Sequence, residues 1–332
     1  MGQLTPRFEL VDLPKRSDGP DFARDAREGL TAVPKRLPPA HFYDAQGSRL
    51  FDQITRLPEY YVSRTELAIL RAHAAEIAAD APPHSALVEL GSGSSQKTRA
   101  LIEALLARQK ALHYVAVDIS RDALEDAARL LLADYPALTV TALAGDYDSG
   151  LDWLARHARG PKLALYLGSS LGNFEPRRAQ ELLAAVARGL APGDGLILGA
   201  DLQKEVAVVE AAYNDAAGVT ARFNLNLLRR LNDRLGAAFH PEDFAHRAFY
   251  NSSAHKIEMH LEALRAHDVF VSALGGPVHF DRGETIHTED SHKYTLPQLD
   301  ALAAAAGLRR RASWLDDRRW FSVSRLEAAR AL

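Results

Sequence analysis

The chain has 332 residues, of which 47% are hydrophobic and 25% are charged, and its formal net charge is −3. These values suit a globular protein of one large or two smaller domains, and the balanced charge argues against a nucleic-acid or membrane partner. The absence of cysteine excludes disulfides, thiolate nucleophiles and zinc–thiolate sites. With no secretory signal and no long apolar run, we expect a cytoplasmic monomer.

The N-terminal third begins with a polar segment, 1–37, that contains several prolines and glycines. This composition predicts an irregular arm with one short helix near 21–29. Aromatic and acidic residues mix in 38–61, and the apolar spacing in 63–79 predicts a helix that ends before Pro82 and Pro83.

Short apolar runs then alternate with helical patterns, which is typical of βαβ units and of a parallel sheet buried on both faces. The helical patterns cover 96–106, 121–132 and 179–190. The predicted strands are 86–90, 113–117, 138–144, 162–167 and 195–199.

The alternation stops between residues 203 and 292. Helical patterns at 204–217 and 221–235 are followed by strand patterns at 256–264 and 268–273. A helix over 296–305 and strands over 310–315 and 319–324 complete the chain. We therefore expect a doubly wound, Rossmann-like α/β core from 62–202 plus 293–332, and a second, substrate-binding domain from 1–61 plus 203–292.

The segment from Glu89 to Thr98 places Gly91 and Gly93 where the first core strand turns into a helix. A phosphate-binding P-loop and a dinucleotide fingerprint each require a glycine where Gln96 stands. The remaining interpretation is the acid-x-Gly-x-Gly loop of S-adenosylmethionine-dependent methyltransferases. A carboxylate near that loop suits a cationic sulfonium ligand.

Acids follow the next two predicted strands. Asp118 is placed to accept the ribose hydroxyls, Asp146 to accept the adenine amino group, and Tyr147 to pack on the adenine ring. Lys97 is placed to reach the methionyl carboxylate. Each acid could instead be an ordinary helix cap, but together with the loop they favour S-adenosylmethionine as the methyl donor.

Beyond the fourth predicted strand, Asn173 offers a donor and an acceptor where such folds bind their substrates. Methyl transfer needs placement of the two reactants more than a protein nucleophile, and no Ser-His-Asp pattern or nucleophile elbow is present. Eight of the 13 histidines lie between His240 and His292, but their spacing fits no metal motif, so we expect no metal.

Longer strings spread over most of the chain resemble the histidine Nα-methyltransferases of ergothioneine biosynthesis. They include Phe42-Tyr43-Asp44-Ala45, Leu50-Phe51-Asp52-Gln53-Ile54-Thr55, Leu57-Pro58-Glu59-Tyr60-Tyr61, Arg64-Thr65-Glu66, Leu167-Gly168-Ser169-Ser170-Leu171-Gly172-Asn173, Tyr213-Asn214-Asp215-Ala216-Ala217-Gly218-Val219-Thr220, Phe223-Asn224 and Ile257-Glu258-Met259.

The resemblance implies a role for each matching position. It assigns Gly91, Lys97, Asp118, Asp146 and Tyr147 to the cofactor, with Tyr147 standing where the family has phenylalanine. It implies L-histidine as substrate and up to three methylations, which give Nα-trimethylhistidine (hercynine). The residues that would hold histidine are Tyr60, Asn173 and Tyr213 at the amino and carboxylate groups, Glu289 and Ser291 at the imidazole, and Met259 in the same pocket.

Tyr43 and Tyr60 are the candidates to assist removal of the amine proton. Two alternatives stay open from the sequence: a methyltransferase for another amino acid or small amine, and a non-catalytic S-adenosylmethionine-binding subunit. An indole pocket would gain nothing from the carboxylate of Glu289, which favours histidine over tryptophan.

Overall fold

The computed structural model describes residues 7–14 and 21–329. Its contacts divide the chain into two compact units. The first comprises the described residues of Met1–Ser17, Val62–Gln203 and Lys293–Leu332, and the second those of Asp18–Tyr61 and Lys204–His292. No helix among the described residues is long and apolar enough to cross a membrane.

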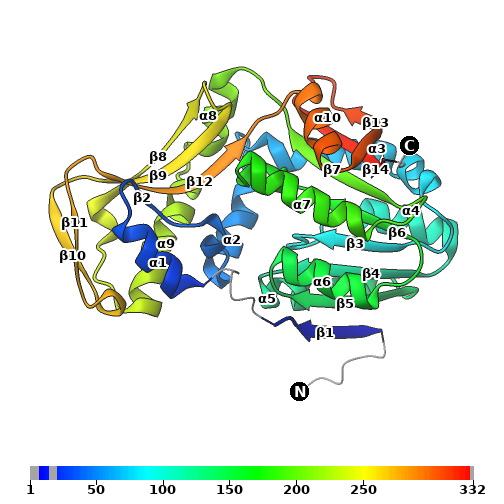
Figure 1. Cartoon of the computed structure of the whole chain (residues 1–332), viewed down its shortest axis with the longest axis horizontal. Helices are drawn as coiled ribbons and strands as arrows, with labels where there is room; N and C mark the ends of the chain where they lie inside the picture. Colours follow the sequence, from blue (N-terminus) through cyan, green and yellow to red (C-terminus); the bar gives the residue numbers. More distant parts are fainter. Residues whose placement is uncertain (1–6, 15–20, 330–332) are drawn as a thin grey trace. The chain divides into compact units, whose positions relative to one another are not determined.

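The first unit is built on one sheet with the strand order β1-β5-β4-β3-β6-β7-β14-β13 (Figure 1). The six strands from β1 to β7 in this order are parallel, and β14 pairs antiparallel with both β7 and β13. The predicted doubly wound α/β core is confirmed. The strands are β1 Phe8–Asp12, β3 Ala86–Leu90, β4 Leu112–Asp118, β5 Leu138–Ala144, β6 Lys162–Tyr166, β7 Gly195–Asp201, β13 Leu308–Leu315 and β14 Phe321–Ala328.

Helices cover this sheet because its strands are apolar on both faces. Side chains of α6, α7 and α10 join alternate strand residues such as Val88, Val115 and Leu196 in one core, and α4 and α5 pack against β4 and β5. The helices of this unit are α3 Tyr61–Asp80, α4 Arg99–Gln109, α5 Arg121–Asp134, α6 Tyr147–His157, the 3₁₀ turn η2 Ser170–Asn173, α7 Pro176–Gly189 and α10 Leu296–Ala305.

The N-terminal arm differs from its prediction. We expected 1–37 to be irregular and to belong to the substrate-binding domain, but β1 pairs in parallel with β5, with Phe8 opposite Val140. The guanidinium of Arg7 also donates to the carbonyl oxygens of Leu132, Tyr135 and Leu138 at 3.0 Å. An edge strand that is only partly buried lacks the apolar pattern of a core strand, so β1 could not be predicted from the sequence.

The second unit contains a four-stranded sheet with the order β2-β12-β9-β8 and a separate pair, β10-β11. Its strands are β2 Lys35–Arg36, β8 Phe244–Asn251, β9 Lys256–Ala263, β10 His267–Val271, β11 Gly276–Phe280 and β12 Thr285–His292. Its helical segments are α1 Phe22–Thr31, η1 Pro39–Phe42, α2 Ala45–Ile54, α8 Val206–Tyr213, α9 Val219–Leu235, η3 Pro241–Asp243 and η4 Ser272–Leu274.

A β-bulge in β12 determines which of its side chains lie on each face of the sheet. The Cα register passes from His287 opposite His260 to Glu289 opposite Met259, so Thr288 is the extra residue. Glu289 and Ser291 therefore share one face with the buried residues Ile257 and Met259, which we call the inner face. The opposite face, which we call the polar face, carries Lys256, Glu258, His260, His287 and Asp290.

Candidate functional site

The glycine loop follows β3 at the point where the sheet order reverses, since β3 has β4 on one side and β6 on the other. Gly91 and Gly93 have φ angles of 74° and 50°, which side chains rarely adopt. A Cβ on Gly91 would also lie 2.7 Å from the hydroxyl oxygen of Tyr147. The loop therefore needs glycine at Gly91 for both conformation and space.

Asp118 ends β4 and is joined to the loop. Its Oδ2 accepts the backbone N–H of Gly93 at 2.8 Å, and its Oδ1 accepts that of Ser120 at 2.9 Å. Burial raises the pKa of Asp118, and these backbone hydrogen bonds oppose the rise. A carboxylate oxygen can accept more than one hydrogen bond, so Asp118 keeps capacity for the hydroxyls of a ligand.

Asp146 and Tyr147 begin α6. Asp146 accepts the backbone N–H of Ser149 at 2.8 Å and so caps the helix, which is the alternative weighed from the sequence. This cap uses one of its two oxygens. The ring of Tyr147 meets Tyr166 and Phe174 edge-on, with centroids 5.4 and 6.2 Å away. A cluster of three aromatic rings thus lies beside the glycine loop.

Lys97 is held by a carboxylate that the sequence analysis missed. Its ammonium forms an ion pair with Glu66, which is fully buried. The N–H of Gly168 lies 2.8 and 2.9 Å from the two oxygens of Glu66. A Cβ on Gly199 would lie 1.9 Å from Oε1 of the same carboxylate, so β7 requires glycine there. Glu66 lies mid-helix in α3, and only its place in the string Arg64-Thr65-Glu66 marks it.

Glu89, the acid of the glycine motif, lies among hydroxyl groups. Its carboxylate accepts from the hydroxyl of Thr98 at 2.7 Å and from that of Tyr114, and Ser95 lies 3.0 Å from the Tyr114 oxygen. Burial raises the pKa of Glu89 to about 7, against the effect of these hydrogen bonds. Glu89 therefore braces the loop from within, and its effect on a bound sulfonium stays a prediction.

In the second unit, Tyr213 donates its hydroxyl hydrogen to Ser291 Oγ at 2.8 Å, and both residues are buried. The ring of Tyr60 meets that of Tyr213 edge-on at 6.1 Å. Glu289 and its cross-strand partner Met259 are buried on the same inner face. The structure thus gathers five of the sequence-predicted substrate residues in one unit.

Phe51 connects the two tyrosines that we expected to assist catalysis. Its ring lies 5.8 Å from that of Tyr43 and 6.3 Å from that of Tyr60, edge-on in both cases. Only the string around Phe51 marked it in the sequence. Asn173, at the end of η2 after β6, is the one predicted substrate residue in the first unit.

A partly buried polar network holds the backbone of Tyr213. His246 Nε2 lies 2.8 Å from the Tyr213 carbonyl oxygen, and the amide of Asn224 donates to His246 Nδ1 at 2.9 Å. These partners place the imidazole proton on Nε2. Burial lowers the pKa of His246, so the ring is neutral near pH 7. Sequence reasoning missed His246, because its neighbours give it no motif.

These features define a class. An open parallel sheet with a glycine loop at its switch point, and an acid at the end of the adjacent strand, is the core of the class I S-adenosylmethionine-dependent methyltransferases.

Comparison with known proteins gives the family. The histidine-specific, S-adenosylmethionine-dependent methyltransferase family matches residues 22–328, and the chain belongs to it. It is 45% identical to the histidine N-alpha-methyltransferase of Mycolicibacterium smegmatis, over 91% of this chain and 93% of that protein.

More distant relatives include ergothioneine biosynthesis protein 1 of Neurospora crassa, at 34% identity over 85% of this chain and 32% of that longer protein. An N-methyltransferase of Aspergillus fumigatus is 32% identical over 84% of this chain and 76% of that protein. Membership of the family makes this chain an enzyme that takes its methyl group from S-adenosylmethionine.

Proposed function

We propose that this enzyme methylates the α-amino nitrogen of L-histidine three times, giving Nα-trimethylhistidine (hercynine) for ergothioneine biosynthesis. The main support is the inner face of β12. There Glu289 is buried two residues before Ser291, which accepts a hydrogen bond from Tyr213. Support from known proteins is the 45% identity to a histidine N-alpha-methyltransferase over 93% of that relative.

Glu289 and Ser291 serve the imidazole in this proposal. A neutral imidazole has one donor and one acceptor nitrogen, which a carboxylate and a hydroxyl complement. An apolar substrate side chain in place of the imidazole would offer these two polar groups no hydrogen bond, at about 1–3 kcal/mol each, which disfavours other amino acids. Met259 packs in the same pocket, and Tyr60, Asn173 and Tyr213 bind the amino and carboxylate groups.

Gly91, Lys97, Asp118, Asp146 and Tyr147 hold the methyl donor. When bound, S-adenosylmethionine supplies a methyl group on a positively charged sulfur. The amine must be neutral to attack it, and an α-amino group is largely protonated near pH 7. One proton therefore leaves before each of the three transfers, and we assign its removal to Tyr43 and Tyr60.

Mass spectrometry of reactions with purified enzyme, S-adenosylmethionine and each of the twenty amino acids tests the proposal. We expect up to three added methyl groups on histidine alone. Methylation of a different amino acid would overturn the roles of Glu289 and Ser291. Cofactor binding without any methylation would point to another small amine or to a non-catalytic subunit.

Two variants test the assigned roles. Glu289→Gln keeps the size of the side chain but replaces an acceptor oxygen with an amide, so the KM for histidine should rise about ten-fold or more. Tyr60→Phe should lower turnover more than histidine binding. Unchanged turnover in Tyr60→Phe would remove this hydroxyl from the mechanism.

A further inference from the structure

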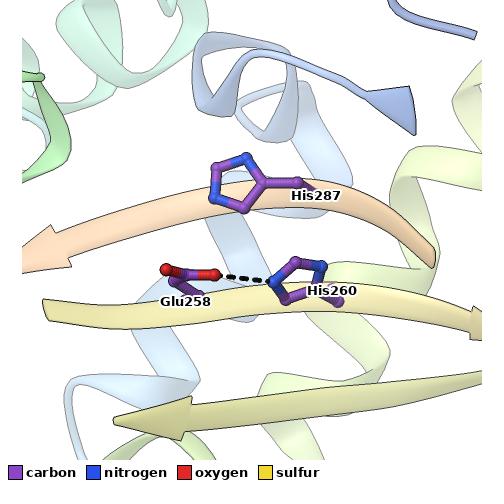
Figure 2. A group of neighbouring side chains, drawn as sticks. All are labelled: Glu258, His260 and His287. Atoms are coloured by element: carbon purple, nitrogen blue, oxygen red, sulfur yellow. Dashed lines mark hydrogen bonds and ion pairs between the residues drawn. The ribbon is translucent and has the colours of Figure 1, made fainter. Parts of the chain in front are cut away.

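Two histidine–carboxylate pairs face each other on the polar face of the second unit's sheet. Glu258 and His260 lie two residues apart on β9, and His287 on β12 is the direct cross-strand partner of His260. Figure 2 shows the three side chains on these neighbouring strands. One donor atom from each of the three lies within 4.8 Å of the other two, and His260 Nε2 is 3.2 Å from Glu258 Oε2.

The surroundings hold two of these ligands in place. The ring of Phe249 stacks on that of His260, with centroids 5.4 Å apart and an interplanar angle of 14°. The amide of Asn251 donates to Glu258 Oε1 at 2.7 Å, which leaves Oε2 directed at His260.

Asp290 supplies a second carboxylate. Its Oδ1 lies 2.8 Å from His287 Nε2, and its Oδ2 accepts from the ammonium of Lys256 at 2.9 Å. The same ammonium lies 3.7 Å from Glu258 Oε1, so two carboxylates share one lysine at this cluster.

We propose that Glu258, His260 and His287 bind a divalent transition-metal ion of the Zn²⁺ class, with Asp290 as the adjoining carboxylate. Two imidazoles and a carboxylate suit Zn²⁺ and its neighbours, whereas Mg²⁺ and Ca²⁺ prefer oxygen ligands alone. Tetrahedral bonds of about 2.0–2.1 Å place ligand atoms about 3.3 Å apart, so His287 has to approach by about 1.5 Å at most.

We expected no metal from the sequence, because we sought the helical spacing of known metal motifs among the histidines. On a strand, however, residues two apart share a face, so Glu258-x-His260 is a two-ligand pattern there. The ion would join β9 to β12 next to the bulge, behind the face that carries Met259, Glu289 and Ser291. The proposal is independent of the substrate proposed above.

Titration of the full-length, tag-free protein with ZnSO₄ after chelator treatment and desalting tests the site. We expect calorimetry to show about one Zn²⁺ per chain with a micromolar or lower dissociation constant, and a higher melting temperature in excess Zn²⁺. Added Mg²⁺ should not compete. Co²⁺ in place of Zn²⁺ should give visible absorption bands typical of mixed nitrogen and oxygen ligands.

Variants locate the ion. His260→Ala, His287→Ala and Glu258→Gln should each weaken Zn²⁺ binding at least ten-fold and abolish the thermal shift. Glu258→Gln also guards against misfolding, because it keeps the acceptor for Asn251. The matched control is His279→Ala, since His279 also lies beside carboxylates, 2.7 Å from Asp268, but on the separate pair β10-β11. Wild-type binding in the first three variants, an equal loss in the control, or no binding to the wild type would overturn the proposal.

Discussion

Glu89 lies beneath the glycine loop, and its carboxyl group should titrate near neutral pH. Replacing Glu89 with glutamine removes this titration, so comparison with the wild type measures its effect on stability. Burial raises its pKa from an ordinary 4.5 to about 7. The amide of Glu89→Gln has almost the same shape and can still bond to the hydroxyls of Thr98 and Tyr114. It carries no charge at any pH, so only the charge is removed.

The sign of the effect follows from proton linkage. Below pH 4.5 the carboxyl of Glu89 is protonated in both the folded and the unfolded chain, and above pH 7 it is ionised in both. Between these values only the folded chain keeps the proton, so the free energy of unfolding falls as pH rises. The fall is about 1.4 kcal/mol per pH unit and about 3 kcal/mol in all. Glu89→Gln lacks this fall.

Urea unfolding at pH 5, 6, 7 and 8, followed by tryptophan fluorescence, measures the effect. All three tryptophans, Trp153, Trp314 and Trp320, belong to the first unit, which also holds Glu89. Other groups contribute equally to both proteins, so the difference between the two stability curves reports Glu89 alone. The variant should gain about 3 kcal/mol relative to wild type between pH 5 and pH 8.

A difference curve that stays flat over this range would refute the raised pKa of Glu89. Tyr114→Phe provides a second check, because it removes a hydroxyl that stabilises the ionised carboxylate. The pKa of Glu89 should then rise further, and the stability loss should move to higher pH. We also expect Glu89→Gln to keep the affinity for S-adenosylmethionine within the same order of magnitude. Its amide oxygen can still accept from Thr98 and Tyr114, so the loop stays braced.

Three further variants probe the two proposed binding sites. Tyr213→Phe removes the hydroxyl that bonds to Ser291 and should raise the KM for histidine about ten-fold at unchanged cofactor affinity, as steady-state kinetics and calorimetry would show. Gly91→Ala forces a Cβ to 2.7 Å from the Tyr147 hydroxyl and should abolish cofactor binding in calorimetry while leaving the circular dichroism unchanged. Asp118→Asn loses one acceptor oxygen and should weaken cofactor binding about ten-fold in the same titration.

The first unit was largely predictable because its strands are buried on both faces. A short apolar run between helical patterns, such as Ala86–Leu90, is typical of a buried parallel strand, and the predicted run at 138–144 coincides with β5. Helix and strand ends were less accurate, since α4 begins at Arg99 rather than at 96. The edge strand β1 was missed because one neighbour and partial burial leave no apolar signature.

Strand β12 was missed for the opposite reason: its buried positions are polar. Of its eight residues only Ile286 is apolar, because Glu289 and Ser291 occupy inner-face positions where an ordinary strand carries valine or leucine. The bulge at Thr288 then breaks the period of two. The residues that we assign to substrate binding thus break the alternation of apolar and polar residues by which a strand is predicted. Only the family resemblance indicated these residues.

Three acids of the first unit, Glu66, Asp118 and Asp201, differ in their partners. Glu66 and Asp201 are fully buried and pair with Lys97 and Lys293. Lys293 is itself buried, so drawing it away from Asp201 would cost several kcal/mol. Lys97 is partly exposed and its ammonium has three donors, so it can stay paired with Glu66 while it also binds a ligand. Asp118 is half-buried and accepts from backbone N–H groups, which fix its orientation without neutralising its charge. Asp118 and Asp201 both end strands of the same sheet, so sequence position does not distinguish them. The partner does: Asp201 is paired with a buried ammonium and supports the fold, whereas Asp118 is oriented by backbone amides and keeps its charge and spare lone pairs for a ligand.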